Sequence, residues 1–137
     1  MSDHGHHHPA DLTRNQSLVM GELTNAKGPL SAYTILDRLR DAGFRAPLQV
    51  YRALDKLVEF GLVHRLESLN AFVACRHPGC DGDDKVAFMI CEKCGQVREI
   101  ADEALDGRLS QLAKEAGFVL KKATLELRGL CQTCAAA

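Results

Sequence analysis

The cysteines are the residues of this sequence whose type and spacing most directly indicate chemistry. Four of the six form two Cys-x-x-Cys pairs, Cys91 with Cys94 and Cys131 with Cys134. Gly95 follows the first pair and lets the backbone turn its amides toward sulfur. Two such pairs supply four thiolates from only two chain segments, the ligand set of a closed tetrahedral zinc site. The spacing therefore predicts one structural zinc ion.

Redox and disulfide uses of these thiols fit the sequence less well. A redox dithiol lies where a strand turns into a helix, whereas residues 89–100, "MICEKCGQVREI", read as strand, turn and strand. Residues 1–30 contain no apolar signal-peptide core, and no stretch approaches a membrane span. We therefore expect a cytoplasmic protein without a membrane partner, in which thiols stay reduced. The 36 residues between the pairs, 95–130, must fold as an insertion.

The elements that position these residues begin with three helices. Thr13 and Ser31 are suited to cap the first two, and Pro47 is suited to the first turn of the third. Glycines at 43 and 61 end the second and third helices. Two short strands follow, joined by a polar turn. The expected ranges are 12–29, 31–43 and 46–61 for the helices, and 62–68 and 71–75 for the strands. This order predicts a winged helix-turn-helix.

In such a fold the last helix enters the major groove of DNA, and the polar residues of its early turns face the bases and phosphates. Gln49 can pair with an adenine edge, and Arg52 with guanine or phosphate. Lys56 and Arg45 would add backbone contacts. The formal net charge is −1, but residues 11–66 hold a small excess of Lys and Arg over Asp and Glu. The alternative, that these are solvated positions of an amphipathic helix, stays open at this point.

The second half of the chain reads as a small α+β unit that holds both cysteine pairs. Its expected strands are 85–91, 95–100 and 118–129, and a helix is expected over 102–117. Apolar residues alternate with polar ones along the last strand, namely Val119, Ala123, Leu125 and Leu127. That alternation predicts a sheet face or edge that a second copy of the chain covers, so we expect a homodimer.

Together these segments predict the α+β class, with a winged helix-turn-helix followed by a small α+β dimerisation domain. We expect the DNA-binding domain over residues 11–76, a hinge loop over 77–85 and the dimerisation and zinc-binding domain over 86–137. Residues 1–10, "MSDHGHHHPA", are expected to be a disordered His-rich tail or the remnant of a tag.

Nearly the whole chain resembles the ferric uptake regulator family, and within it the zinc uptake regulator branch. The motifs are "SAYTILDRLR", "VYRALDKLVEFGLVHRLES", "FMICEKCGQVREI" and "GLCQTC". The resemblance implies a homodimeric repressor of zinc-acquisition genes that binds double-stranded operator DNA. Tyr51 and Arg52 match the pair on the family's recognition helix. Iron-type members typically have a His-His-Asp-His cluster before the first pair, where this chain has "DDKVAFMIC".

The resemblance also implies a second, regulatory zinc near the hinge. Residue matching places His64, Cys75 and Glu99 in that site. Imidazole, thiolate and carboxylate all bind zinc, and these three come from different segments, so the ion would cross-link them. A fourth ligand is expected in the loop "RHPGCDGDDK", where donor chemistry favours His77 and alignment favours Asp84, with Cys80 also possible.

This interpretation predicts a repressor whose regulatory zinc favours the DNA-binding dimer, so metal and operator strengthen each other's binding. An enzyme is not expected, because the zinc deaminase signature is missing: Ile90, not proline, precedes Cys91. The alternative functions are a thiol redox switch that uses Cys75 with Cys80 or the Cys-x-x-Cys thiols, and a relative that senses iron or peroxide. The thiolate in the regulatory set favours zinc over iron.

Overall fold

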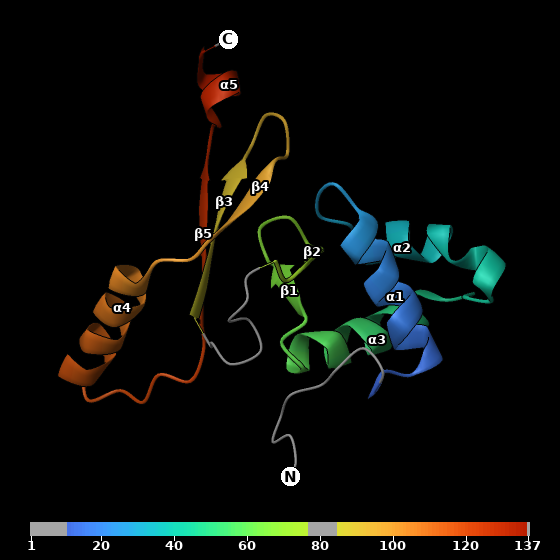
Figure 1. Ribbon diagram of the computed structural model, residues 1–137, viewed down its shortest axis with the longest axis horizontal. Helices are drawn as coiled ribbons and strands as arrows, with labels where there is room; N and C mark the ends of the chain where they lie inside the picture. The colour runs from blue at the N-terminus through green and yellow to red at the C-terminus, as the bar shows by residue number, and fades with distance from the viewer. Residues whose placement is uncertain (1–10, 77–84, 137) are drawn as a thin grey trace. The chain divides into compact units, whose positions relative to one another are not determined.

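The computed structural model describes residues 11–76 and 85–136 of the chain (Figure 1). The chain divides into two compact units, Met1–Gly82 and Asp83–Ala137, and each is described here by itself. The expected tail at residues 1–10 and nearly all of the expected hinge loop lie outside the described residues.

The first unit is a winged helix, as the sequence predicts. Its hairpin is antiparallel, with Val63 opposite Ala74 and Leu66 opposite Ala71. Leu30 adds a short rung to this hairpin, because its amide donates to the carbonyl of Phe72 at 3.0 Å and its carbonyl accepts from the amide of Phe72 at 2.8 Å. The elements are α1 (Arg14–Asn25), α2 (Ala32–Arg38), the 3-10 helix η2 (Arg40–Ala42), α3 (Pro47–Glu59), β1 (Val63–Leu66) and β2 (Ala71–Ala74).

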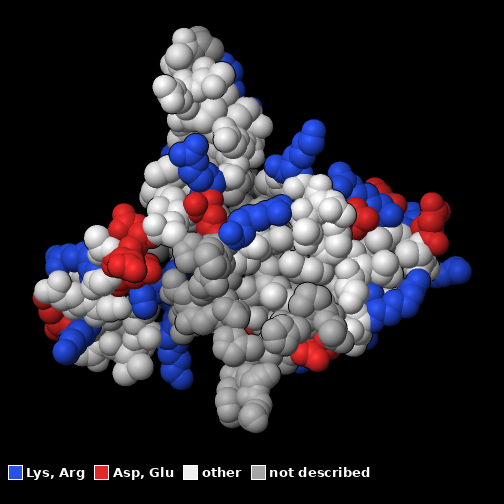
Figure 2. Space-filling model, viewed as in Figure 1, with Lys and Arg blue, Asp and Glu red and all other residues white. Residues whose placement is uncertain are grey.

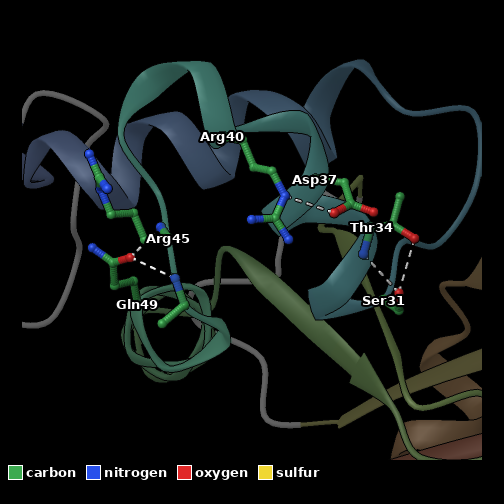
Figure 3. A network of polar contacts seen from close by, with 7 residues as sticks. Ser31, Thr34, Asp37, Arg40, Arg45 and Gln49 are labelled. Carbon is green, nitrogen blue, oxygen red and sulfur yellow. Dashed lines mark hydrogen bonds and ion pairs between the residues drawn. The ribbon is translucent and has the colours of Figure 1, made fainter.

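The predicted helix caps are present. The Thr13 hydroxyl accepts from the amide of Gln16 at 3.2 Å, and the Gln16 side-chain oxygen accepts from the amide of Thr13 at 3.1 Å. This reciprocal pair satisfies amides at the start of α1 that have no partner within the helix. Ser31 caps α2 in the same way, accepting from the amide of Thr34 at 3.1 Å (Figure 3).

One helix of the first unit differs from its prediction. The expected single helix over residues 31–43 is α2 followed by the separate turn η2. Leu39 has φ −107° and ψ 11°, outside helical geometry, and its amide is shared between the carbonyls of Ile35 and Leu36. The apolar spacing of residues 35, 36 and 39 is the same in both arrangements, so periodicity could not separate them. Gly43 ends the segment at φ 101°, a left-handed conformation that glycine adopts without strain.

The core of the first unit determines which face of α3 is exposed to solvent. One face of α3 is buried against α1, α2 and the hairpin, through Val50, Ala53, Leu54 and Leu57. Burying a leucine fully stabilises the fold by roughly 1.5–3 kcal/mol relative to leaving it exposed. The polar residues of α3 are therefore held on the opposite, exposed face.

The second unit is a three-stranded sheet with one long helix. The strand order is β4-β3-β5, with β3 antiparallel to β4 and parallel to β5. The predicted strand, turn and strand around the first cysteine pair is confirmed, and so is a folded insertion between the pairs. The elements are β3 (Lys85–Cys91), β4 (Val97–Ile100), α4 (Glu103–Glu115), β5 (Ala123–Gly129) and α5 (Gln132–Ala136).

The last strand is shorter than predicted. β5 begins at Ala123 rather than at residue 118, and Val119 lies outside it with 78% of its surface exposed. Gly117 follows the end of α4 with φ 68°. Residues 118–122 connect the helix to β5, which pairs in parallel with β3. A parallel neighbour requires such a crossover, which strand periodicity does not indicate. Helix α5 was also not predicted, because five residues are too few for a helical pattern.

No described helix has both the length and the apolar character needed to cross a bilayer.

Replacing Leu54 tests this core. Leu54 is 0% exposed, so Leu54→Ala should lower the free energy of unfolding of the first unit by about 2–5 kcal/mol. Leu48 lies on the same helix but is 56% exposed, so Leu48→Ala should change the free energy of unfolding by less than about 0.5 kcal/mol. Urea unfolding of the zinc-loaded variants, followed by helical circular dichroism, measures both. Equal losses in the two variants would contradict the assigned buried face.

Candidate metal centres and nucleic-acid interface

The two cysteine pairs lie at one edge of the second unit. Cys91 is the last residue of β3, and Cys94 lies in the turn that follows it. Cys131 stands between β5 and α5, and Cys134 is within α5. Because β3 and β5 are parallel, with Cys91 opposite Gly129, both strands end at the same edge and bring the two pairs together.

The turn after β3 is held by hydrogen bonds to both backbone and sulfur. The amide of Gly95 donates to the carbonyl of Cys91 at 3.0 Å, and the amide of Cys94 donates to the Cys91 sulfur at 3.5 Å. Gly95 has φ 81°, so the turn requires the glycine that the sequence places there. The amide of Cys91 donates to the carbonyl of Gln96 at 2.9 Å and closes the turn against β4.

The sulfur geometry fits a zinc ion. The four sulfur atoms all lie within 4.8 Å of one another, and those of Cys94 and Cys131 are 3.8 Å apart. Zinc–sulfur bonds of about 2.3 Å in a tetrahedron place neighbouring sulfurs roughly 3.8 Å apart. The residues present can therefore hold zinc with all four positions filled by protein, which is the arrangement of a structural site.

The thiols of this cluster differ in their readiness to ionise. The backbone amides of Cys94 and Cys131 donate to sulfur and lower the pKa of Cys91 to about 6. Hydrogen bonding to the Cys131 sulfur, with burial, raises the pKa of Cys134 to about 12. Four neighbouring thiols cannot all carry negative charge without a cation. Zinc supplies that charge and displaces the remaining protons, so its affinity must fall as the pH is lowered.

The hairpin of the first unit brings together two of the residues expected in a regulatory site. His64 lies on β1 opposite Val73, and Cys75 follows directly after β2, so the two are diagonal neighbours on one face. Their ligand atoms lie within 4.8 Å of each other, and both side chains are half-buried. Cys75 is anchored by its amide, which donates to the carbonyl of Leu62 at 2.9 Å.

Of the other expected regulatory ligands, the structure describes only Glu99. Glu99 belongs to the second unit, on β4 opposite Phe88, with its side chain half-buried. His77, Cys80 and Asp84 lie outside the described residues. Cys75 is in a disulfide in this structure, whereas a metal ligand must be a thiolate. A site that includes Cys75 is therefore a site of the reduced chain.

The residues expected to contact DNA do not all lie on one face of α3. Gln49, Arg52 and Lys56 follow one another at helical spacing, and together they line a groove between α3 and the start of α1. Tyr51 lies on another side of the helix, half-buried and packed against the core. Arg45 precedes the helix and is exposed.

Charges around this groove are mixed rather than uniformly basic, because Asp55 and Glu59 line it together with Arg52 and Lys56. Lys56 forms an exposed ion pair with Glu59 at 3.5 Å, which contributes little and leaves the ammonium available to a phosphate. On the face drawn in Figure 2, basic and acidic side chains are interspersed. Attraction to DNA must then come from a few placed cations rather than from a broad field.

One contact of Gln49 was not anticipated from the sequence. Its side-chain oxygen accepts hydrogen bonds from the backbone amides of Arg45 and Ala46, at 2.6 and 3.0 Å (Figure 3). Gln49 is the third residue of α3, the position from which a glutamine reaches back in a capping box. That position could have indicated the contact, but a capping box usually has Ser or Thr at the cap, and here the cap is Ala46.

The fold and the tetrathiolate cluster define a class, the metal-binding winged-helix proteins. The sequence profile of the ferric uptake regulator family matches residues 12–128. The chain therefore belongs to the ferric uptake regulator family. This is a family of regulators, and the protein is not an enzyme.

Individual relatives lie in the zinc uptake regulator branch, as the sequence motifs predict. The zinc uptake regulation protein of Escherichia coli K12 is 40% identical over 124 residues, which are 90% of this chain and 72% of that protein. The crystal structure of holo XcZur has a TM-score of 0.82 and 44% identity, covering 92% of this chain and 87% of that one. A zinc uptake regulator complexed with zinc and DNA has a TM-score of 0.82 and 38% identity, covering 90% and 83%.

Removing one sulfur tests the tetrathiolate site. Cys134→Ser should lower the zinc content by one ion per chain, because a hydroxyl does not replace a thiolate at zinc. Thr133→Ser changes the neighbouring exposed residue and should leave the zinc content as in the wild type. Elemental analysis after dialysis against zinc-free, reducing buffer measures both. Equal zinc content in Cys134→Ser and the wild type would show that this cluster is not the site.

Proposed function

We propose that this protein is a zinc-responsive, DNA-binding transcriptional repressor of zinc-acquisition genes. The observation that carries the proposal is the similarity, over 90% of the chain, to a protein named for zinc uptake regulation. A relative of 38% identity has been solved in complex with zinc and DNA. The winged helix, with Gln49, Arg52 and Lys56 on the outer face of α3, supplies a matching DNA-binding surface.

The proposed sensor is a second zinc, bound by His64, Cys75 and Glu99 of the reduced chain. Support comes from the hairpin, where the ligand atoms of His64 and Cys75 lie within 4.8 Å of each other. One nitrogen, one sulfur and one carboxylate oxygen form a set that zinc accepts readily. The fourth position is assigned to His77, with Asp84 or Cys80 as the alternatives in the same loop.

The proposed active form is a homodimer. In the second unit large apolar side chains are exposed, and α4 has no buried residue. Large apolar side chains left exposed are typical of a surface that a partner covers. A second copy of the chain would bury them and would place two winged helices on successive major grooves of one duplex. The exposed apolar residues are Met89, Leu112, Phe118, Val119, Leu127 and Leu130.

The proposed mechanism is a thermodynamic linkage between metal and DNA. Regulatory zinc connects the hairpin of the winged helix to the second unit, and it stabilises the arrangement that fits the operator. Metal and operator then raise each other's affinity by the same factor, typically about 5- to 150-fold. Acid weakens the response, because zinc needs Cys75 as the thiolate and His64 as the neutral imidazole.

The soft thiolate of Cys75 favours zinc over iron as the sensed metal. We place the protein in the cytoplasm, because a repressor has to reach operator DNA and because metal binding requires reduced thiols.

The test begins with DNA. Full-length, reduced protein is used to select duplexes from a random-sequence pool, once with zinc and once with a chelator that spares the tetrathiolate site. We expect a defined two-fold related sequence with zinc and no enrichment with chelator. Selection that does not depend on zinc would contradict the proposed response.

Variants then test the sensor. Cys75→Ser and Glu99→Gln should each weaken zinc-dependent binding of the selected duplex by about 5- to 150-fold, because each removes a ligand of the regulatory ion. Glu92→Gln removes a similar charge from the turn after β3, where the Glu92 side chain makes an exposed pair with Arg128, and should bind as the wild type does. Fluorescence anisotropy at fixed free zinc measures all three. Wild-type affinity in Cys75→Ser would show that the sensor lies elsewhere.

A further inference from the structure

The side chain of Gln49 has a second role that limits how it can meet DNA. It lies in the first turn of α3, and its oxygen accepts hydrogen bonds from the amides of Arg45 and Ala46, as Figure 3 shows. Ala46 stands at the cap position, and its methyl group cannot accept a hydrogen bond. Gln49 therefore supplies the acceptor that the start of α3 needs.

These two contacts fix the orientation of the amide group. Both partners are backbone N–H groups, so only the side-chain oxygen can stand between them. Turning the amide over would place its NH2 group against two other donors and would break both hydrogen bonds. Both lone pairs of the oxygen are therefore used within the protein, and the oxygen cannot accept a hydrogen bond from a base. The nitrogen, with its two N–H groups, lies on the far side of the amide from these partners (Figure 3).

Gln49 lies on the surface that the proposed function places in the major groove. Gln49, Arg52 and Lys56 line the same groove beside α3. All three then present only donors: an amide nitrogen, a guanidinium and an ammonium. The three cannot accept a hydrogen bond from a base while the cap is intact.

We propose that Gln49 is a specificity-determining residue that donates only, and that it selects a base with acceptors in the major groove, guanine or thymine. Guanine offers O6 and N7, and thymine offers O4; adenine also offers N7, but its neighbouring amino group is a donor that the committed side chain cannot accept from. The familiar pairing of glutamine with adenine is excluded, because it needs the side-chain oxygen to accept from the adenine amino group. This inference rests on the proposed function, since it requires α3 to meet DNA, and it replaces the adenine pairing expected from the sequence.

Gln49→Glu separates the two roles of the side chain. A carboxylate still accepts from the amides of Arg45 and Ala46, and a negative charge is favourable at the start of a helix, so the cap is kept. Toward DNA the variant has only acceptors. It should prefer cytosine or adenine, whose amino groups donate in the major groove. Gln49→Ala removes both the oxygen that caps α3 and the NH2 group that would donate to a base.

The experiment is selection from a random-sequence duplex pool with the zinc-loaded, reduced full chain. We expect the wild type to prefer guanine or thymine at one position of each half-site, by about fivefold or more over the other bases. Gln49→Glu should change that position to cytosine or adenine and leave the others unchanged. Gln49→Ala should show no preference there. The thermal midpoint should fall in Gln49→Ala and not in Gln49→Glu.

Gln16→Glu is the matched control. Gln16 occupies the equivalent position of α1, caps through its oxygen in the same way and lines the same groove. Its substitution adds the same charge, so it should weaken binding to a similar extent without changing the base preferred at the Gln49 position.

The inference is overturned if Gln49→Glu selects the same bases as the wild type, or if the wild type prefers adenine at the one position that Gln49→Ala makes neutral. In both cases the proposed function stands. If the wild type selects no sequence with zinc, the proposed function fails, and the inference fails with it.

Discussion

The second unit holds four cysteine sulfur atoms close together, and as thiolates they repel one another unless a cation is bound between them. The buried apolar residues of this unit in the described chain are Ala87, Phe88, Ile90 and Cys91, all on β3. Such a small core supplies little stability, and small units commonly rely on a metal for the remainder. With zinc bound, the cluster ties the end of β3 to the segment after β5. It thereby holds the edge of the sheet whose face we assign to the dimer.

The first unit contains both a proposed metal ligand, Cys75, and the helix that we propose meets DNA, α3. Cys75 follows β2 directly, and the guanidinium of Arg76 donates to the carbonyls of Leu23 and Ala26 at the end of α1, at 3.4 and 3.3 Å. The start of α1 in turn borders the groove beside α3. Packed helices that share one core shift as units, so we expect a change at Cys75 to reach the DNA-facing surface through these contacts.

Much of this arrangement follows from local sequence. The cysteine spacing predicts the tetrathiolate, because two Cys-x-x-Cys turns can be recognised without knowing the fold. Thr13 and Ser31 mark the helix starts, because capping is a local interaction. The fold class and family also follow from the motifs. The proximity of His64 and Cys75 was implied only by resemblance, because it depends on the register of the hairpin, which local sequence does not specify.

Several features were not predicted from the sequence, because apolar periodicity does not indicate them. The break of the second helix at Leu39 keeps the same apolar spacing as a continuous helix. The late start of β5 comes from the crossover that its parallel pairing with β3 requires. Gln49 was expected to use its whole amide on DNA, but the cap of α3 takes the oxygen because Ala46 offers none. Each of these residues interacts with a group that sequence periodicity does not identify.

Regulatory zinc and operator DNA are proposed to be thermodynamically linked, and such a linkage must be reciprocal. The measurement is the affinity of the reduced, tetrathiolate-loaded protein for its second zinc, by competition with a chelator of known affinity, with and without a selected duplex. We expect DNA to tighten zinc binding by the same factor by which zinc tightens DNA binding. A zinc affinity that is unchanged by saturating DNA would contradict it.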